Sequence, residues 1–348
     1  NPDGTQKLNV AGQPIPTYST SDIVGLADVF TGYSWYSPNP TTNTFLGKNR
    51  VAAAITTPMI AYPAFHATNA KTFLGTTIPA SATPDPSGDL KIALDTLFNH
   101  PNTGPFISRQ LIQRLVTSNP SSEYVGRVAA VFANNGHGVR GDMGAVIKAI
   151  LLDPDARDTA GAQADPNFGK LREPVIRMAE WMRAFKANSA SGNWLLTSTS
   201  DNTTLNQSVL FAPSVFNFWR PGYSPPETRL GGLGYVAPEF QVVDEVSIAG
   251  YLNTMQAAIG AGIGTGKDIA APYTAEMALA ADPAALAERM DQLLLYGRMS
   301  TDLRSRILSA VSGVALPPSG TARQAALSNR VKLAIYMAMA SPEFMAQR

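Results

Sequence analysis

The sequence predicts a mainly α-helical fold, in the form of a multi-helix globular domain with a few short β-strands and long irregular loops. From residue 89 onward, apolar residues recur at helical spacing in successive stripes that are separated by short breaks. Hydrophobic residues make up 45% of the 348 residues, so a sizeable core is available. Two other stretches, residues 33–88 and 187–237, are expected to form small β or irregular excursions.

The first helix is expected to begin after Ser19-Thr20-Ser21-Asp22, because such residues cap helix N-termini and apolar residues follow at helical spacing. Gly32 is its expected end. Farther along, Met59–Tyr62 and Thr72–Ile78 have the composition of short strands, and we expect them to make a small hairpin.

Each of the following apolar stripes predicts one helix, and the stripes begin at Leu90, Phe106, Tyr124 and Met143. Their short links favour antiparallel packing. A polar stretch at 153–170 predicts a linker, and a helix is expected from about Glu173 to Lys186.

Helices resume at Pro238, and the sequence Asp282-Pro283 is typical of an N-cap followed by proline in the first turn. The last long helix holds Ala325 to Met339. We therefore expect an N-terminal helical part with an irregular insertion, a linker, and a C-terminal helical part, over residues 1–152, 153–170 and 171–348. One continuous domain is the alternative.

Composition excludes several classes of function. Formal net charge is +1, from 27 basic and 26 acidic residues, so we expect no nucleic-acid partner. The chain has no cysteine, which excludes disulfides, thiolate metal sites and cysteine nucleophiles. No stretch of 18 apolar residues occurs, so no transmembrane helix is expected. Charged residues make up only 15%, and the surplus of Thr and Asn favours an exported protein.

The first residues, Asn1-Pro2-Asp3-Gly4-Thr5, are typical of a turn inside a protein. They include no initiator Met and no signal peptide. We therefore expect the chain to be a fragment, preceded by a segment that carries the export signal.

The glycine-rich segment at 259–268 suggests a nucleotide-binding loop but has the wrong spacing. Counting back from Gly266-Lys267, the first glycine of a phosphate loop would stand at Ala261, and Asp268 replaces the required Ser or Thr. A flexible loop between helices is expected instead. No serine-hydrolase elbow and no His-Glu-x-x-His motif occurs, so we expect no metal and no cofactor.

The densest polar segment is Asn99–Pro105, followed by Arg109 and Arg114 on the next expected helix. Two arginines near a helix start and beside His100 would suit an anion, because the free backbone N–H groups there also attract negative charge. The alternative interpretation is structural. In that case Asn102 or Thr103 caps the helix, Pro105 starts it, and Arg109 pairs with a buried carboxylate.

Two other groups of residues are weaker candidates. His66 and Lys71 flank a polar turn, and sharing a site with His100 is a hypothesis. The aromatic loop Phe211–Tyr223 holds Trp219, which would stack on a sugar ring, but packing in the core at a helix junction is the alternative.

Several segments together resemble the bacterial family catalogued as domain of unknown function 1800 (DUF1800). They are Asn1–Thr5, Gly12–Tyr18, Asp28–Tyr33, His66–Gly75, Phe98–Leu111 and Ala340–Phe344. The resemblance covers nearly the whole chain and places it on the C-terminal two-thirds of the family pattern. It implies a helix-rich, exported protein, whose gene often lies beside that of an exported companion protein with a phosphatase-like fold.

The resemblance makes five candidates family-motif positions without assigning them a role: His66, Lys71, His100, Asn102 and Arg109. The family has no established activity, so whether the chain is an enzyme stays open.

Our leading expectation is a non-enzymatic protein in the periplasm or at the cell surface that acts by binding or assembly at the envelope. Its expected partners are an exported companion protein, a glycan or an anionic ligand. The alternative is a hydrolase that acts on an anionic or carbohydrate substrate near His66, His100 and Arg109.

Overall fold

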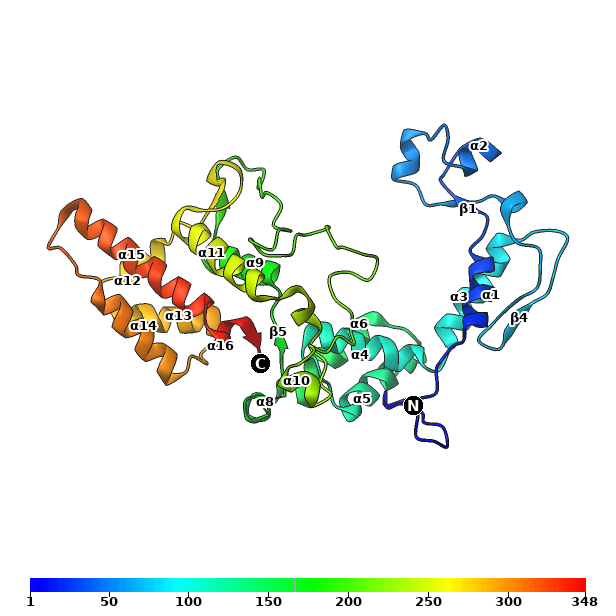
Figure 1. Ribbon diagram of the computed structural model, residues 1–348, viewed down its shortest axis with the longest axis horizontal. Coiled ribbons are helices and arrows are strands. Elements are labelled where there is room, and N and C mark those ends of the chain that lie inside the picture. Colours follow the sequence, from blue (N-terminus) through cyan, green and yellow to red (C-terminus); the bar gives the residue numbers. More distant parts are fainter. Residues whose placement is uncertain (166) are drawn as a thin grey trace. The chain divides into compact units, whose positions relative to one another are not determined.

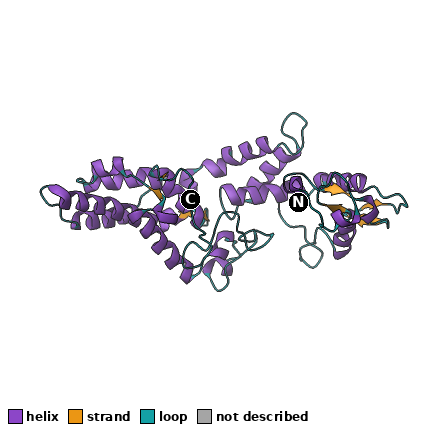
Figure 2. Ribbon diagram, turned by 90° about the horizontal axis from the view of Figure 1, so that it is seen from above, coloured by secondary structure: helices purple, strands orange, loops and turns teal. Residues whose placement is uncertain are grey.

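Helices account for most of the regular structure in the computed structural model, which describes residues 1–165 and 167–348 (Figures 1 and 2). The strands contain two or three residues each, and they form four separate antiparallel pairs within the described residues. The predicted fold class is therefore confirmed. The chain divides into two compact units, which comprise residues 1–109 with 121–149 (unit 1) and residues 110–120 with 150–348 (unit 2).

Unit 1 begins with short elements and continues with four longer helices. Its first elements are α1 (Thr20–Val29), β1 (Tyr33–Ser34), α2 (Thr42–Phe45), the 3-10 helix η1 (Ala52–Ile55), β2 (Ile60–Ala61), the 3-10 helix η2 (Pro63–Phe65), β3 (Lys71–Phe73) and β4 (Thr76–Ile78). The helices that follow are α3 (Pro86–Asn99), α4 (Thr103–Leu115), α5 (Ser122–Ala133) and α6 (Met143–Leu152). The last residues of α4 and α6 belong to unit 2.

The start of α1 follows from its capping residues. Ser19 and Asp22 form a capping box, in which each side chain accepts a hydrogen bond from the other residue's backbone N–H. The helix ends at Val29, three residues before Gly32, whose φ of 77° lies in the left-handed region. A side chain at Gly25 would place its Cβ 2.0 Å from the carbonyl oxygen of Thr72, so only glycine allows α1 to approach β3 this closely.

The strand pairing differs from the expected hairpin. Thr72–Ile78 holds β4 and all of β3 except Lys71, and the two strands form one hairpin because Leu74 and Gly75 adopt positive φ and reverse the chain between them. The other β-prone segment, Met59–Tyr62, pairs through β2 with β1. The composition of these segments indicated strands but did not determine which strands pair.

The buried core around α1 is small. It consists of Val29, Phe73, Ile78 and Ala93, with Leu26 packed against it. Because so few apolar side chains are buried here, polar contacts carry a larger share of the packing between α1, the β3–β4 hairpin and α3.

Helices make up most of the regular structure of unit 2, which also contains a long irregular stretch between β6 and α10. Its first elements are α7 (Pro154–Arg157), α8 (Thr159–Ala164), β5 (Lys170–Leu171), α9 (Pro174–Ala184), β6 (Asn188–Ser189), α10 (Arg229–Gly232), the 3-10 helix η3 (Pro238–Val242) and α11 (Glu245–Ala261). The remaining elements are the 3-10 helix η4 (Thr265–Lys267), β7 (Ile269–Ala270), α12 (Thr274–Leu279), α13 (Pro283–Met290), the π-helix η5 (Asp291–Leu295), α14 (Thr301–Gly313), α15 (Gly320–Met339), α16 (Pro342–Met345) and β8 (Ala346–Gln347).

The core of unit 2 is large. Helices α13, α14 and α15 pack on one another, and α9 and α11 add their apolar faces (Figure 1). The largest fully buried side chains in this core include Trp181, Tyr251, Met255, Leu286 and Met290. Burial of this size stabilises unit 2 mainly through the hydrophobic effect.

Two segments that were expected to be loops contain regular structure. The expected linker at 153–170 contains α7, α8 and the start of β5, and Pro166 within it lies outside the described residues. The glycine-rich segment at 259–268 forms the end of α11, η4 and an isolated bridge between Ile263 and Ile269. In the described part of the chain, no helix is both long and apolar enough to cross a membrane.

Candidate ligand-binding site

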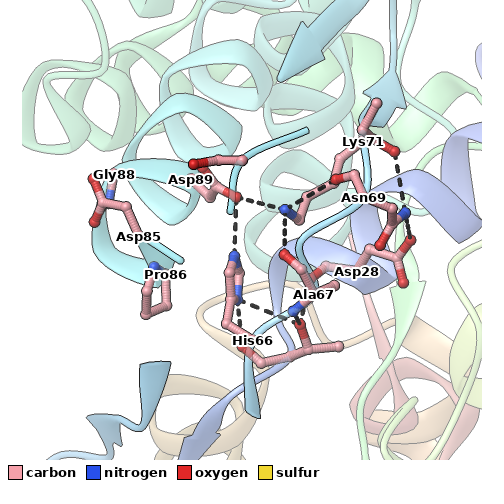
Figure 3. A network of polar contacts seen from close by, with 12 residues as sticks. Asp28, His66, Ala67, Asn69, Lys71, Asp85, Pro86, Gly88 and Asp89 are labelled. Atoms are coloured by element: carbon pink, nitrogen blue, oxygen red, sulfur yellow. Dashed lines mark hydrogen bonds and ion pairs between the residues drawn. The ribbon is translucent and has the colours of Figure 1, made fainter. Parts of the chain in front are cut away.

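Two of the candidate residues, His66 and Lys71, belong to a polar network in unit 1 (Figure 3). His66 follows η2, Lys71 opens β3, and Asp89 lies in the first turn of α3. Asp85 caps α3 by accepting a hydrogen bond from the Gly88 N–H at 3.0 Å, which sets where the helix starts.

A single carboxylate oxygen contacts the side chains of both His66 and Lys71. Oδ2 of Asp89 lies 2.9 Å from Nε2 of His66 and 2.8 Å from Nζ of Lys71. The Lys71 ammonium also donates to the carbonyl oxygens of Ala67 and Asn69, at 2.7 and 3.4 Å. His66 and Lys71 are only 6% and 3% exposed, so water does not compete for these contacts.

Both ring nitrogens of His66 face partners inside the protein. Nδ1 of His66 lies 2.8 Å from the carbonyl oxygen of Thr31, which can only accept. The Thr31 hydroxyl gives its one proton to the carbonyl of Asp28, at 2.6 Å. Nε2 of the same ring faces the Asp89 carboxylate at 2.9 Å.

Asp89 therefore lies between His66 and Lys71. Burial by itself raises the pKa of Asp89, but the hydrogen bonds and charges of His66 and Lys71 lower it by more, so the net pKa lies below its ordinary value. The ring nitrogens of His66 and the ammonium of Lys71 are engaged inside the protein. The network therefore connects the end of α1, β3 and α3.

His100 does not join this network. Asp89 precedes it by eleven residues along α3, which corresponds to roughly 16 Å of helix. The hypothesis of a site shared by His66 and His100 is therefore not supported by the geometry, because catalytic groups must reach one reacting atom.

His100 instead lines a cavity of about 460 Å³ in unit 1, which we call the unit 1 groove. Its lining comes from α1, the β3–β4 hairpin, the end of α3 and the start of α4, and most of it is apolar. The residues that line it are Thr17, Tyr18, Asp22, Ile23, Leu26, Phe73, Leu74, Leu97, His100, Asn102, Thr103 and Phe106. An apolar cavity of this size with a few polar groups is typical of a ligand site.

Two polar side chains of the groove keep hydrogen-bonding capacity. Nδ1 of His100 accepts a hydrogen bond from the backbone N–H of Asn102 at 3.2 Å, which places the ring proton of the neutral imidazole on Nε2. Among the described residues, Nε2 has no partner. Within the described part of the chain, the Asn102 side chain contacts only the Thr17 hydroxyl, at 3.4 Å. His100 and Asn102, both of which the sequence indicated as candidates, therefore lie in one cavity.

Asp22, the carboxylate in the lining of the groove, has a structural role. Asp22 accepts hydrogen bonds from Ser19 and from the Leu74 N–H, at 2.7 Å each. The hydrogen bonds from the Ser19 side chain and backbone are the main reason why the pKa of Asp22 is lowered. This carboxylate fastens the start of α1 to the β3–β4 turn.

The contacts of Arg109 match neither of the two interpretations of this segment. It pairs with no carboxylate among the described residues, and Nη2 donates to the carbonyl oxygen of Gly4 at 3.3 Å. The expected pairing with a buried carboxylate is corrected accordingly. The helix start is closer to expectation, since α4 begins at Thr103 and the carbonyl of Asn102 accepts from the Phe106 N–H at 3.0 Å.

Arg114 and Trp219 meet in unit 2. The guanidinium carbon of Arg114 lies 4.8 Å from the centre of the Trp219 ring, and the tryptophan is buried. Beside them, Glu239 is 1% exposed and lies 3.2 Å from Nζ of Lys170 and 3.7 Å from Nη1 of Arg114. Because Arg114 covers the ring, Trp219 is packed in the core and presents no face for a sugar.

Sequence analysis missed the carboxylates of both clusters. Asp89 stands 23 residues after His66, and Glu239 stands far along the chain from Arg114. Neither spacing corresponds to one helix face or one turn, so no local pattern could connect the partners.

The comparison with known proteins gives a family. The family described as Protein of unknown function (DUF1800) matches residues 8–346, which is nearly the whole chain. The chain belongs to this family. No curated protein and no solved structure matches it. The family thus agrees with the resemblance in the sequence but adds no activity, and the proposals below rest on the geometry.

Proposed function

We propose that this chain is an exported, non-enzymatic protein of the cell envelope, in the periplasm or at the cell surface. In this proposal the unit 1 groove binds an apolar segment of a partner protein. The observation that carries the proposal is the exposure of Tyr18, Ile23 and Phe106, which line the groove and each expose more than half of their surface. Exposed apolar side chains that gather at a cavity are typical of an interaction site.

The chemistry of the groove favours a peptide segment over a purely apolar ligand. Apolar side chains of the partner would cover Tyr18, Ile23 and Phe106, which removes them from water. A backbone carbonyl of the same segment would accept the free Nε2 proton of His100, and Asn102 offers both a donor and an acceptor. An exported companion protein is the partner that the family resemblance suggests.

The alternative, a hydrolase acting on an anionic or carbohydrate substrate, has less support. His66 has both nitrogens engaged inside the protein, and His100 lies toward the other end of α3. Arg109 holds the backbone at Gly4. A hydrolase would need a base, a nucleophile and a charge-stabilising group that meet at one point, and these three residues do not supply it.

Site-specific photo-crosslinking in cells that make the full-length protein tests the proposal. A photoreactive residue replaces Tyr18, and the expected product is a discrete adduct in the envelope fraction whose attached segment is rich in apolar residues. Ile23→Ser and Phe106→Ser, made separately, should each reduce the adduct at least about tenfold, because each removes apolar contact area.

Ile55→Ser is the matched control, since Ile55 is an exposed apolar residue of unit 1 that does not line the groove. It should leave the adduct unchanged. A glycan or lipid attached at Tyr18, equal loss in all three variants, or a protein retained in the cytoplasm would contradict the proposal.

A further inference from the structure

A second cavity, of about 690 Å³, lies within unit 2 and is independent of the groove. One wall is a face of α9, where Ile176, Glu180 and Arg183 stand four and three residues apart and therefore on one side of the helix. The end of the π-helix η5 forms part of the opposite lining. The polar and aromatic residues that line the cavity are Arg172, Glu180, Arg183, Tyr296, Arg298 and Gln347.

The cavity has more positive than negative charge. Its lining holds three arginines and one glutamate. Arg172 and Glu180 neutralise each other through two hydrogen bonds, at 2.9 and 3.1 Å. Arg183 is exposed and pairs with no carboxylate in the described residues, whereas Arg298 already donates to the main-chain oxygen of Arg348. The Arg183 guanidinium therefore remains for an anion.

Tyr296 is held at this cavity by unusual backbone geometry. It directly follows the π-helix Asp291–Leu295, and its φ of 56° lies in the left-handed region, which side chains other than glycine rarely adopt. Backbone conformations of this kind are retained where they place a functional side chain. The Tyr296 ring is 61% exposed, and its hydroxyl donates to Glu180 at 2.9 Å.

These features together define a ligand with an anionic group and a ring. We propose that the unit 2 cavity binds a sugar that carries a carboxylate or phosphate group. Arg183 receives the anionic oxygens, which a planar guanidinium group binds well. The exposed face of Tyr296 packs against the sugar ring. Glu180 and Gln347 are the hydrogen-bond partners of its hydroxyl groups.

Four probes separate the contributions of charge and ring: glucuronate, glucose 6-phosphate, glucose and inorganic phosphate. Binding to the full chain is followed by saturation-transfer NMR and calorimetry. At least one of the two charged sugars should bind saturably, and at least about tenfold more tightly than glucose or inorganic phosphate. The preference between them tells carboxylate from phosphate. Raising the salt concentration should weaken binding of the charged sugar.

Arg183→Gln and Tyr296→Asn are the informative variants. The first removes an exposed charge with no carboxylate partner, and the second removes the ring while asparagine tolerates the left-handed backbone. Each should weaken binding at least about tenfold. Arg229→Gln, which changes an exposed arginine outside this cavity, is the matched control and should bind as the original chain does.

Circular dichroism establishes that each variant folds. Absence of saturable binding of both charged sugars up to about 10 mM would overturn the proposal. So would equal binding of glucose, or undiminished binding by folded Arg183→Gln. Arg183 is exposed and carries no packing role, so its variant keeps the test decisive even where a change at Tyr296 impairs folding.

Discussion

Replacing Asp89 by alanine should destabilise unit 1 strongly. The substitution removes the carboxylate that both His66 and Lys71 contact, at 2.9 and 2.8 Å. It leaves Nε2 of His66 without an acceptor and Lys71 with two backbone carbonyls, both inside the protein. Breaking a buried ion pair from one side costs about 3–5 kcal/mol. Because the Asp89 side chain is 13% exposed, some water reaches it, and we expect the free energy of unfolding to fall by about 3 kcal/mol.

The same helix supplies the control. Asp95 pairs with Lys91 one turn away on α3, and these side chains are 60% and 75% exposed. Asp95→Ala should therefore cost less than about 1 kcal/mol. Urea unfolding gives the free energy, and hydrogen exchange followed by mass spectrometry shows whether the loss lies in β3 and α3. Equal stability of the Asp89 and Asp95 variants, within about 0.5 kcal/mol, would refute the argument that the network holds unit 1 together.

Three further predictions concern pH and packing. Since the folded pKa of Asp89 is lowered, its stabilising contribution is present above its ordinary pKa of 3.8 and is lost as pH falls through the folded value; Asp89→Asn should abolish this acid-dependent loss in urea unfolding curves. The pKa of Glu173 shifts in the opposite direction, because burial raises it above its ordinary value of 4.5. The protein should therefore lose stability as pH rises from 4.5 through the folded pKa of Glu173. Glu173→Gln should flatten this part of the pH profile of stability, and an unchanged slope would contradict the prediction. Gly25→Ala should lower the free energy of unfolding by about 1–3 kcal/mol, and with it the melting temperature, because the new Cβ would clash with the Thr72 backbone. Gly260→Ala, at an open helical position, should raise the melting temperature. Equal shifts in the two variants would contradict the close approach of α1 to β3.

The two candidate sites differ in what builds them. The unit 1 groove is formed by apolar side chains that a small core leaves partly uncovered. The unit 2 cavity is lined by charged groups at the edge of a large core, with one aromatic ring held by an unusual backbone conformation. They thus favour different ligands, an apolar segment at the groove and an anionic sugar at the cavity.

Sequence patterns with local causes were interpreted correctly. The capping residues at Ser19 and Asp22 predicted the start of α1, and Asp282 caps α13, whose first residue is Pro283. In these cases the residues that decide the structure lie within a few positions of one another, so a pattern along the chain contains the whole physical argument.

Tertiary structure alone decided the roles of the candidate residues. His66, Lys71, His100 and Arg109 stand in similar polar turns or helix starts, yet the first two are buried against Asp89, His100 lines the groove, and Arg109 holds a backbone carbonyl. A polar side chain's role depends on which partners the fold places within hydrogen-bond distance and on whether water can reach them. By itself, the sequence determined the helical fold class and the family resemblance, because both depend on local spacing and ordered motifs. It could not determine which polar groups would be left free to bind a ligand, because those partners are distant along the chain.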